Sequence, residues 1–282
     1  MKTSSSVRKP AFSGRFYPGS PLGLKELIEC FLVRIKACEL PFRHGKILGG
    51  IVPHAGYIYS GYIAMHFFAL MSQQKFRFDT AIVVCPNHAG TGPEISLDGH
   101  DYWETPLGNV KIDQKFNSLL GLEFCSEAHK YEHSAEVLVP MLQYFFNENF
   151  SLVPVCMWKQ TPEAARLLAS RIASAKKDSG RNILVIASSD FTHYENPEFG
   201  AMQDNLALEK ILAFDVNGLA RVINMHSISM CGSGPAMVLM ELAMKFYQQP
   251  AAQILASGHS GQVAPSDKVV RYVSVCFGEA PA

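Results

Sequence analysis

The feature that most constrains the fold is a set of short, almost wholly apolar runs along the chain. They occupy residues 47–52, 80–84, 152–157 and 182–187. Such runs are apolar on both faces, as in strands that helices cover on both sides. Helical patterns follow at residues 61–72 and after Thr161-Pro162-Glu163, a good N-cap and first-turn sequence. We therefore predict a three-layer α/β/α sandwich with a largely parallel or mixed central sheet, completed by strands at residues 253–256 and 269–276.

Composition sets the class of protein. With 282 residues, 48% of them hydrophobic, the chain can bury a large core, and without linkers or repeats we expect one domain over residues 1–282. Lys plus Arg equal Asp plus Glu at 25 each, so nothing indicates nucleic-acid or anionic membrane binding. No apolar segment is long enough for a signal peptide or a membrane span. Seven cysteines, an odd number without C-x-x-C spacing, favour a reducing, cytoplasmic location.

Polar side chains follow three of these strands. The first leads into His54, the second into His88, and the fourth into Asp190 and His193. Because parallel strands place their carboxyl ends on one rim, where ligands bind in open α/β sheets, we expect these side chains to share a cleft. Each histidine taken alone is better explained as a hydrogen-bonded turn residue. Their recurrence at equivalent strand ends is what favours a common site.

Cys231 begins the segment CGSGP at residues 231–235, just before an amphipathic run at residues 236–246. A cysteine beside a helix N-terminus is favoured as the metal-binding thiolate. Burial in the core is the alternative, and local sequence does not choose between them.

Further candidates surround these positions. His133 precedes Ser134, a plausible N-cap, and Glu136, which suits a first turn. The histidine itself is not explained by capping, and we predict that it contacts a metal ligand or the substrate. We also expect Tyr57 and Tyr194 to offer hydroxyl donors to a substrate. The remaining histidines have no such context: His44, His66, His100, His129, His226 and His259.

Several blocks, in this order, resemble the MEMO family (mediator of ErbB2-driven cell motility), whose prokaryotic members are also called AmmeMemoRadiSam system protein B. The blocks are RKPA at 8–11, GRFYP at 14–18, PHAGYIYSG at 53–61, PNH at 86–88, EHS at 132–134, SDFTHY at 189–194 and CGSGP at 231–235. The resemblance implies a fold like that of class III extradiol dioxygenases, which hold non-haem Fe(II) with two histidines and a glutamate. It also implies a functional link to an AMMECR1-type protein and a radical SAM protein.

The same resemblance assigns residues. His54 and His88 match the first two metal ligands, and the family pattern points to Cys231 rather than a glutamate as the third. Asp190 and His193 match polar residues that line the family's cleft. Asp190 as third ligand would instead give a two-histidine, one-carboxylate triad, typical of Fe(II) oxygenases. Either set leaves coordination positions open for water, oxygen or substrate.

These observations leave three functions open. The first is a redox-type oxidoreductase or metal-binding protein holding Fe(II), with copper or zinc as alternatives. In it, His193 would carry protons near neutral pH, and Asp190 would orient His193 or bind metal. The second is a metal-free cysteine hydrolase using Cys231, His193 and Asp190. The third is a non-catalytic peptide- or protein-binding module that uses the same cleft. For the first two functions, we expect the cleft to accept a small molecule or a peptide as ligand.

Overall fold

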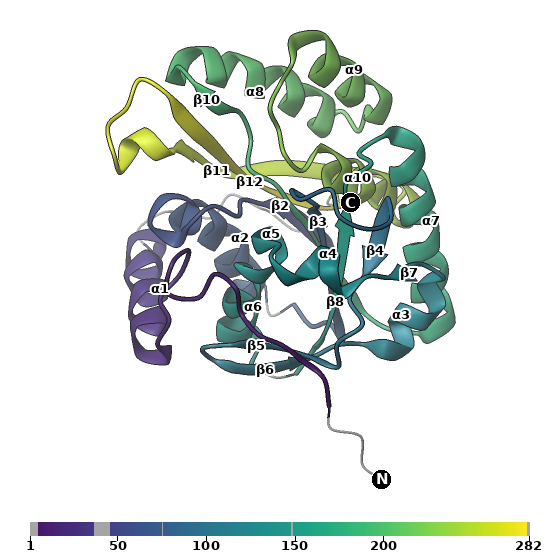
Figure 1. Cartoon of the computed structure of the whole chain (residues 1–282). Helices are drawn as coiled ribbons and strands as arrows, with labels where there is room; N and C mark the ends of the chain where they lie inside the picture. Colours follow the sequence, from purple (N-terminus) through teal and green to yellow (C-terminus); the bar gives the residue numbers. More distant parts are fainter. Residues whose placement is uncertain (1–4, 37–45, 75, 148, 281–282) are drawn as a thin grey trace.

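The computed structural model describes residues 5–36, 46–74, 76–147 and 149–280, so Cys38 and His44 lie outside the described residues. A mixed sheet forms its centre, with strand order β10-β12-β2-β9-β3-β8-β4-β7 and β11 paired to β12 (Figure 1). Its middle is parallel and consists of β2 (Ile47–Val52), β9 (Ile183–Ser188), β3 (Thr80–Pro86) and β8 (Ser151–Met157). The flanking strands are β12 (Val269–Glu279), β11 (Pro250–His259) and β10 (His193–Glu195) on one side, and β4 (Ile95–Leu97) and β7 (Glu123–Phe124) on the other.

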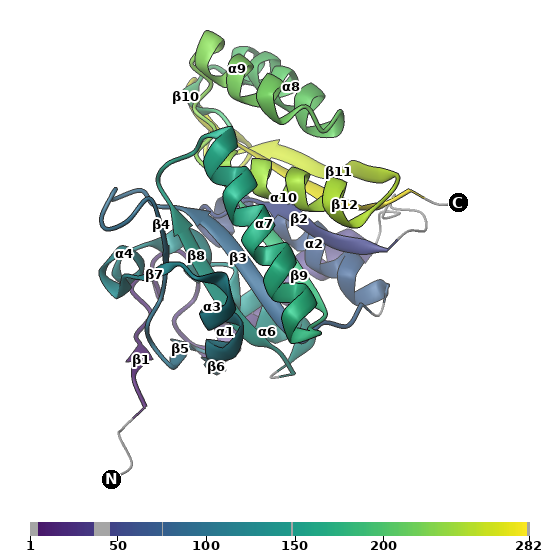
Figure 2. The same ribbon diagram turned by 90° about the vertical axis from the view of Figure 1, so that its right-hand side faces the viewer.

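Helices cover both faces of this sheet, which confirms the predicted three-layer sandwich (Figure 2). One face carries α1 (Pro21–Lys36), α2 (Tyr62–Gln73) and α6 (Val139–Phe146). The other carries α3 (Gln114–Leu120), α7 (Pro162–Ser179), α8 (Pro197–Leu212), α9 (Val216–His226) and α10 (Ser233–Phe246). No helix in the described part of the chain is both long and apolar enough to span a membrane.

The apolar runs are explained by two separate cores. Along β3, Ile82 and Val84 enter the core beneath α7 and α10, whereas Ala81 and Val83 enter the core beneath α2 and α6. Successive side chains of a strand point to opposite faces, so a strand between two cores must be apolar throughout. At α7 the predicted helix start is also confirmed, because the Thr161 hydroxyl accepts a hydrogen bond from the Ala164 amide.

Between residues 94 and 112, β4 joins the main sheet antiparallel to β8, while β5 (Tyr102–Thr105) and β6 (Gly108–Lys111) form a small second sheet with β1 (Val7–Arg8). One local expectation needs correction. Ser134 is not an N-cap. Glu132 caps α5 (His133–Glu136) by accepting a hydrogen bond from the Ser134 amide, and Ser134 lies inside the helix. A carboxylate, like a serine hydroxyl, can accept a hydrogen bond from a backbone amide that has no partner within the first turn of a helix.

Candidate metal centre

The predicted polar rim is present at the carboxyl ends of three adjacent strands. His54 follows β2, Asp190 follows β9 and His88 follows β3, and these strands are neighbours in the sheet. Oδ1 of Asp190 accepts a hydrogen bond from the His54 amide at 2.8 Å. The rings of His54 and His88 lie 5.5 Å apart, centre to centre. The sheet therefore brings together three side chains that are far apart in sequence.

The best metal-binding group among the described residues is His54, His88 and His133, whose ligand atoms all lie within 4.8 Å of one another. His133 comes from α5 and stacks on His88 with ring centres 4.7 Å apart. Its ring centre is 5.3 Å from that of His54. We predicted His133 to be a contact residue, and the structure places it beside both predicted histidine ligands.

Hydrogen bonds fix the orientation and the tautomer of two of these imidazoles, those of His54 and His88. Nδ1 of His54 lies 2.7 Å from the Ser188 hydroxyl, which itself donates to the Ser134 carbonyl at 2.6 Å. That hydroxyl therefore accepts from His54, whose Nδ1 carries the proton. Likewise, Nδ1 of His88 donates to Glu132 Oε1 at 2.9 Å. In their neutral forms both histidines thus present Nε2 as the acceptor atom, which for His54 lies next to the Cys231 sulfur. This is the arrangement in which a second residue orients a metal ligand.

Electrostatics keep two of the three imidazoles neutral. Burial, then the neighbouring histidines, lower the pKa of His54 well below its usual value. Burial lowers the pKa of His133 to about 4. Burial alone would lower the pKa of His88 too, but the hydrogen bond and charge of Glu132 raise it. Burial would raise the pKa of Glu132, yet hydrogen bonds from His88 and Ser134 hold it at about 2. A metal ion bound by His54 and His133 would therefore displace few protons from these two imidazoles.

Cys231 adjoins His54, with Sγ 3.3 Å from Nε2. Its sulfur also accepts a hydrogen bond from the Asp190 amide at 3.2 Å. The expectation that the start of α10 favours the thiolate is wrong for the metal-free thiol. Burial, then the charge of Asp190, raise the pKa of Cys231 well above its usual value. Its place as third metal ligand stays a prediction.

Asp190 is buried behind His54, with Oδ2 4.0 Å from His54 Nε2. Burial raises the pKa of Asp190 to about 7, although hydrogen bonds from the His54 and Ala55 amides oppose the shift. His193 is half-buried, and its Nδ1 donates to the Ser229 carbonyl at 2.8 Å. Its Nε2 is consequently free to accept a proton.

The two tyrosines differ in availability. Tyr194 is 70% exposed, so its hydroxyl is accessible. Tyr57 is only 1% exposed, and its hydroxyl donates to the Val137 carbonyl at 2.8 Å. A substrate contact by Tyr57 stays a prediction, but its hydroxyl is already paired within the core.

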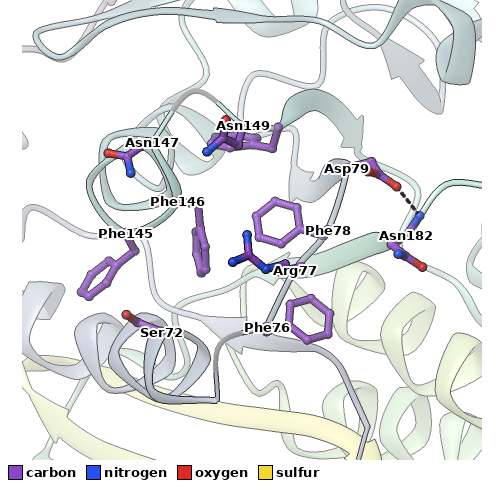
Figure 3. A pocket seen from close by; sticks show the side chains of 11 residues that line it. Ser72, Phe76, Arg77, Phe78, Asp79, Phe145, Phe146, Asn147, Asn149 and Asn182 are labelled. Carbon is purple, nitrogen blue, oxygen red and sulfur yellow. Dashed lines mark hydrogen bonds between the residues drawn. The ribbon is translucent and has the colours of Figure 1, made fainter.

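One cavity lies against the loop that follows His54, without a predicted site residue in its lining, and another lies far from the histidines. The first, about 420 Å³, is mainly apolar, and its lining includes Phe16, Gly56 and Tyr272. The second, about 410 Å³, lies where β3, β8 and β9 begin, at the opposite edge of the sheet. Figure 3 shows Arg77 in that second cavity among Phe76, Phe78 and Phe146. None of the predicted site residues lines it.

Comparison with known proteins settles the family. The sequence model of the Memo-like protein family matches residues 8–276. This chain belongs to the Memo-like family. A MEMO1 family protein of Ignicoccus hospitalis is 42% identical over 96% of this chain and 98% of that relative. A MEMO1 family protein of Sulfurisphaera tokodaii is 40% identical over 97% of this chain and 100% of its own length.

A solved structure extends the comparison beyond the Memo-like sequences. The crystal structure of an uncharacterised protein from Escherichia coli K12 aligns with a TM-score of 0.50, covering 83% of this chain and 100% of that chain. The two share 12% sequence identity, so the likeness concerns the fold alone.

Proposed function

We propose that this protein is a non-haem metal protein of redox type, with Fe(II) held by His54, His88 and a third ligand. The observation that carries the proposal is the pair of imidazoles whose Nδ1 atoms are engaged by Ser188 and Glu132, leaving two Nε2 lone pairs on one cleft. Imidazole donors suit iron, copper and zinc rather than magnesium or calcium. Copper and zinc are therefore the alternative occupants.

Three residues compete for the third position, and the first of them, Asp190, has Oδ2 4.0 Å from His54 Nε2. His133 has its ligand atom within 4.8 Å of those of His54 and His88. Cys231 has its sulfur 3.3 Å from His54 Nε2, and ligation would replace its thiol proton by the metal. We assign Cys231 as the third ligand, because its sulfur lies next to His54 Nε2 and a thiolate with two imidazoles suits iron, copper or zinc. His133 then packs beside the ligands and lines the cleft.

The bound metal would supply an open coordination position for oxygen or substrate. The chain's own residues would handle protons. With its pKa raised to about 7, Asp190 exchanges a proton readily at neutral pH. Half-buried His193, with Nε2 free, can pass that proton between the cleft and solvent. The apolar cavity of about 420 Å³, whose lining includes Ala55 and Gly56 in the loop after His54, would receive the body of a small molecule or a peptide side chain.

The hydrolase alternative is less well supported by the same contacts. The imidazole beside the Cys231 sulfur is that of His54, not that of the expected base His193. The raised pKa of Cys231 also disfavours the thiolate that a nucleophile requires. A non-catalytic binding module can be distinguished from a metal protein by experiment. Peptide binding in such a module would survive the loss of His54 and His88.

The deciding experiment is metal analysis of protein purified anaerobically without added metal. We expect close to one equivalent of iron per chain, and its loss in both His54→Ala and His88→Ala. The exposed His226, in α9, provides a matched control, and His226→Ala should retain the metal. Wild-type protein without metal that also fails to bind added Fe(II) would refute the proposal. Metal content unchanged in both histidine variants would refute the assigned ligands.

A further inference from the structure

A buried carboxylate, that of Glu136, ties the N-terminal segment, residues 8–17, to α5, the helix that carries His133. Oε2 of Glu136 accepts hydrogen bonds from Arg8 Nη1 at 2.8 Å and the Ala11 amide at 3.0 Å. Oε1 accepts from the Phe12 amide and the Tyr17 hydroxyl, both at 2.8 Å. Glu136 and Arg8 are 1% and 3% exposed, so their charges are paired away from solvent. Removing one member of such a buried pair is costly.

The fastened segment lays two aromatic rings on His133. The ring centres of Phe16 and Phe12 lie 4.9 Å and 5.4 Å from that of His133. His133 opens the same helical turn, α5, that Glu136 closes. The Phe16 carbonyl also accepts a hydrogen bond from the Tyr57 amide at 2.7 Å, tying the segment to the loop after His54. Figure 1 shows this N-terminal stretch passing α5 on its way to α1.

The two rings also lie at a boundary. Phe16 contacts His133 and lines the apolar cavity beside Gly56. Phe12 and Phe16 are both partly buried, so they stand between the histidine cluster and solvent rather than deep in the core. An apolar shell around a metal centre controls solvent access and the exchange of ligands.

We propose that residues 8–17 form a wall of the metal centre, in which Glu136 is the positioning residue and Phe12 and Phe16 shield His133. This inference rests on the proposed metal centre for its effect on metal exchange, but its effect on His133 needs no metal. The wall limits access of water and chelators to the cluster. It also holds the imidazole of His133 against His88.

Two measurements test the wall. In metal-free protein, diethyl pyrocarbonate modification of His133 is followed by mass spectrometry, with exposed His226 as the internal reference. In the loaded protein, release of Fe(II) to an excess of chelator is timed. The variants are Phe12→Ala, Phe16→Ala and Glu136→Gln, with Phe16→Tyr as the conservative rescue. Phe199→Ala is the control, since Phe199 is 45% exposed on α8, outside this segment.

We expect modification of His133 to accelerate several-fold and Fe(II) release to accelerate by about 10- to 100-fold in Phe12→Ala and Phe16→Ala. Phe16→Tyr and Phe199→Ala should match wild type. If Glu136→Gln folds, its His133 modification and Fe(II) release should accelerate as in Phe12→Ala and Phe16→Ala. If it does not fold, the two phenylalanine variants alone decide the outcome. Unchanged modification and release in both alanine variants would overturn the wall. Wild-type protein that binds no Fe(II) would refute the proposed metal site. The rate of His133 modification would still decide whether residues 8–17 form the wall.

Discussion

Glu132 holds His88 through two bonds, one carboxylate oxygen accepting from the imidazole Nδ1 at 2.9 Å and the other from the backbone amide at 2.8 Å. The first oxygen also accepts from the Ser134 hydroxyl at 2.6 Å. The side chain of Glu132 is 3% exposed, so these bonds are made out of contact with solvent. His88 is thus oriented by a residue far along the chain, and the strength of metal binding should depend on both.

Glu132→Gln should weaken Fe(II) binding by about 10- to 100-fold, because the amide cannot accept all these bonds or stabilise charge on His88. Titration of metal-free protein with Fe(II) under anaerobic conditions measures the change. Glu127→Gln, on neighbouring α4 (Ser126–Lys130) with a side chain 71% exposed, is the matched control and should bind as wild type does. Equal affinity for both variants would show that Glu132 does not orient a ligand.

Ser188→Ala should also lower metal affinity, because it removes the acceptor that fixes the proton on Nδ1 of His54. The visible spectrum of the Co(II)-substituted protein would report the altered ligand geometry, whereas a stability change alone would leave that spectrum intact. Ser179→Ala removes only local hydroxyl bonds, one donated to the Lys176 carbonyl and one accepted from the Arg181 amide, and serves as control. A Ser188→Ala spectrum that superimposes on wild type contradicts the assigned tautomer.

The stability of the metal-free protein should fall in acid. Burial lowers the pKa of His129 to about 4, below the usual 6.5, so the unfolded chain binds the proton more readily between those values. This contribution is complete above pH 6.5 and is lost as the pH falls towards 4. His129→Gln should therefore reduce the pH slope of the unfolding free energy by up to about 1.4 kcal/mol per pH unit. Urea denaturation at several pH values measures it, and a slope equal to wild type would contradict the assignment.

In metal-free protein the thiol of Cys231 should react slowly with iodoacetamide at neutral pH, because its pKa is raised by burial and by Asp190. Cys30 is exposed on α1 and should be labelled much faster under the same conditions. Mass spectrometry of peptides over time distinguishes the two sites. Labelling of Cys231 at least as fast as that of Cys30 would restore the nucleophile hypothesis.

Gly232→Ala should destabilise the protein by about 1–3 kcal/mol, as overpacking does in a filled interior. A Cβ at this position would lie 2.2 Å from the Ser188 carbonyl oxygen and 2.5 Å from Ser189 Cβ. The close approach seats Cys231 against the end of β9. Thermal unfolding measures the loss, and Gly19→Ala, whose Cβ would have no neighbour closer than 3.4 Å, is the control.

The layers and the rim could be predicted because both follow from local patterns. The apolar runs indicated strands between two cores. The polar residues shortly after three of these runs lie where the carboxyl ends of the parallel strands meet. A contact between His133 and the site was predicted, but its place in the metal-binding group was not, since that depends on how α5 packs against β3. Its signal in the sequence was the adjacent Glu132, a carboxylate beside a histidine. The pKa of Cys231 was mispredicted for a related reason, because the sequence shows the helix start but not the burial that outweighs it.

The positions of these residues on strands and helices determine which of them can change most easily among related chains. His54, Asp190 and His88 follow β2, β9 and β3, three strands held side by side at the roughly 4.8 Å spacing of any sheet. The remaining candidates come from separate helices, His133 from α5 and Cys231 from the turn before α10. Backbone pairing therefore preserves the histidine pair, while substitution in one helix or turn suffices to exchange the third donor. If the proposed metal centre exists, a related chain would need to change only this third donor, and not the strands, to prefer a different metal.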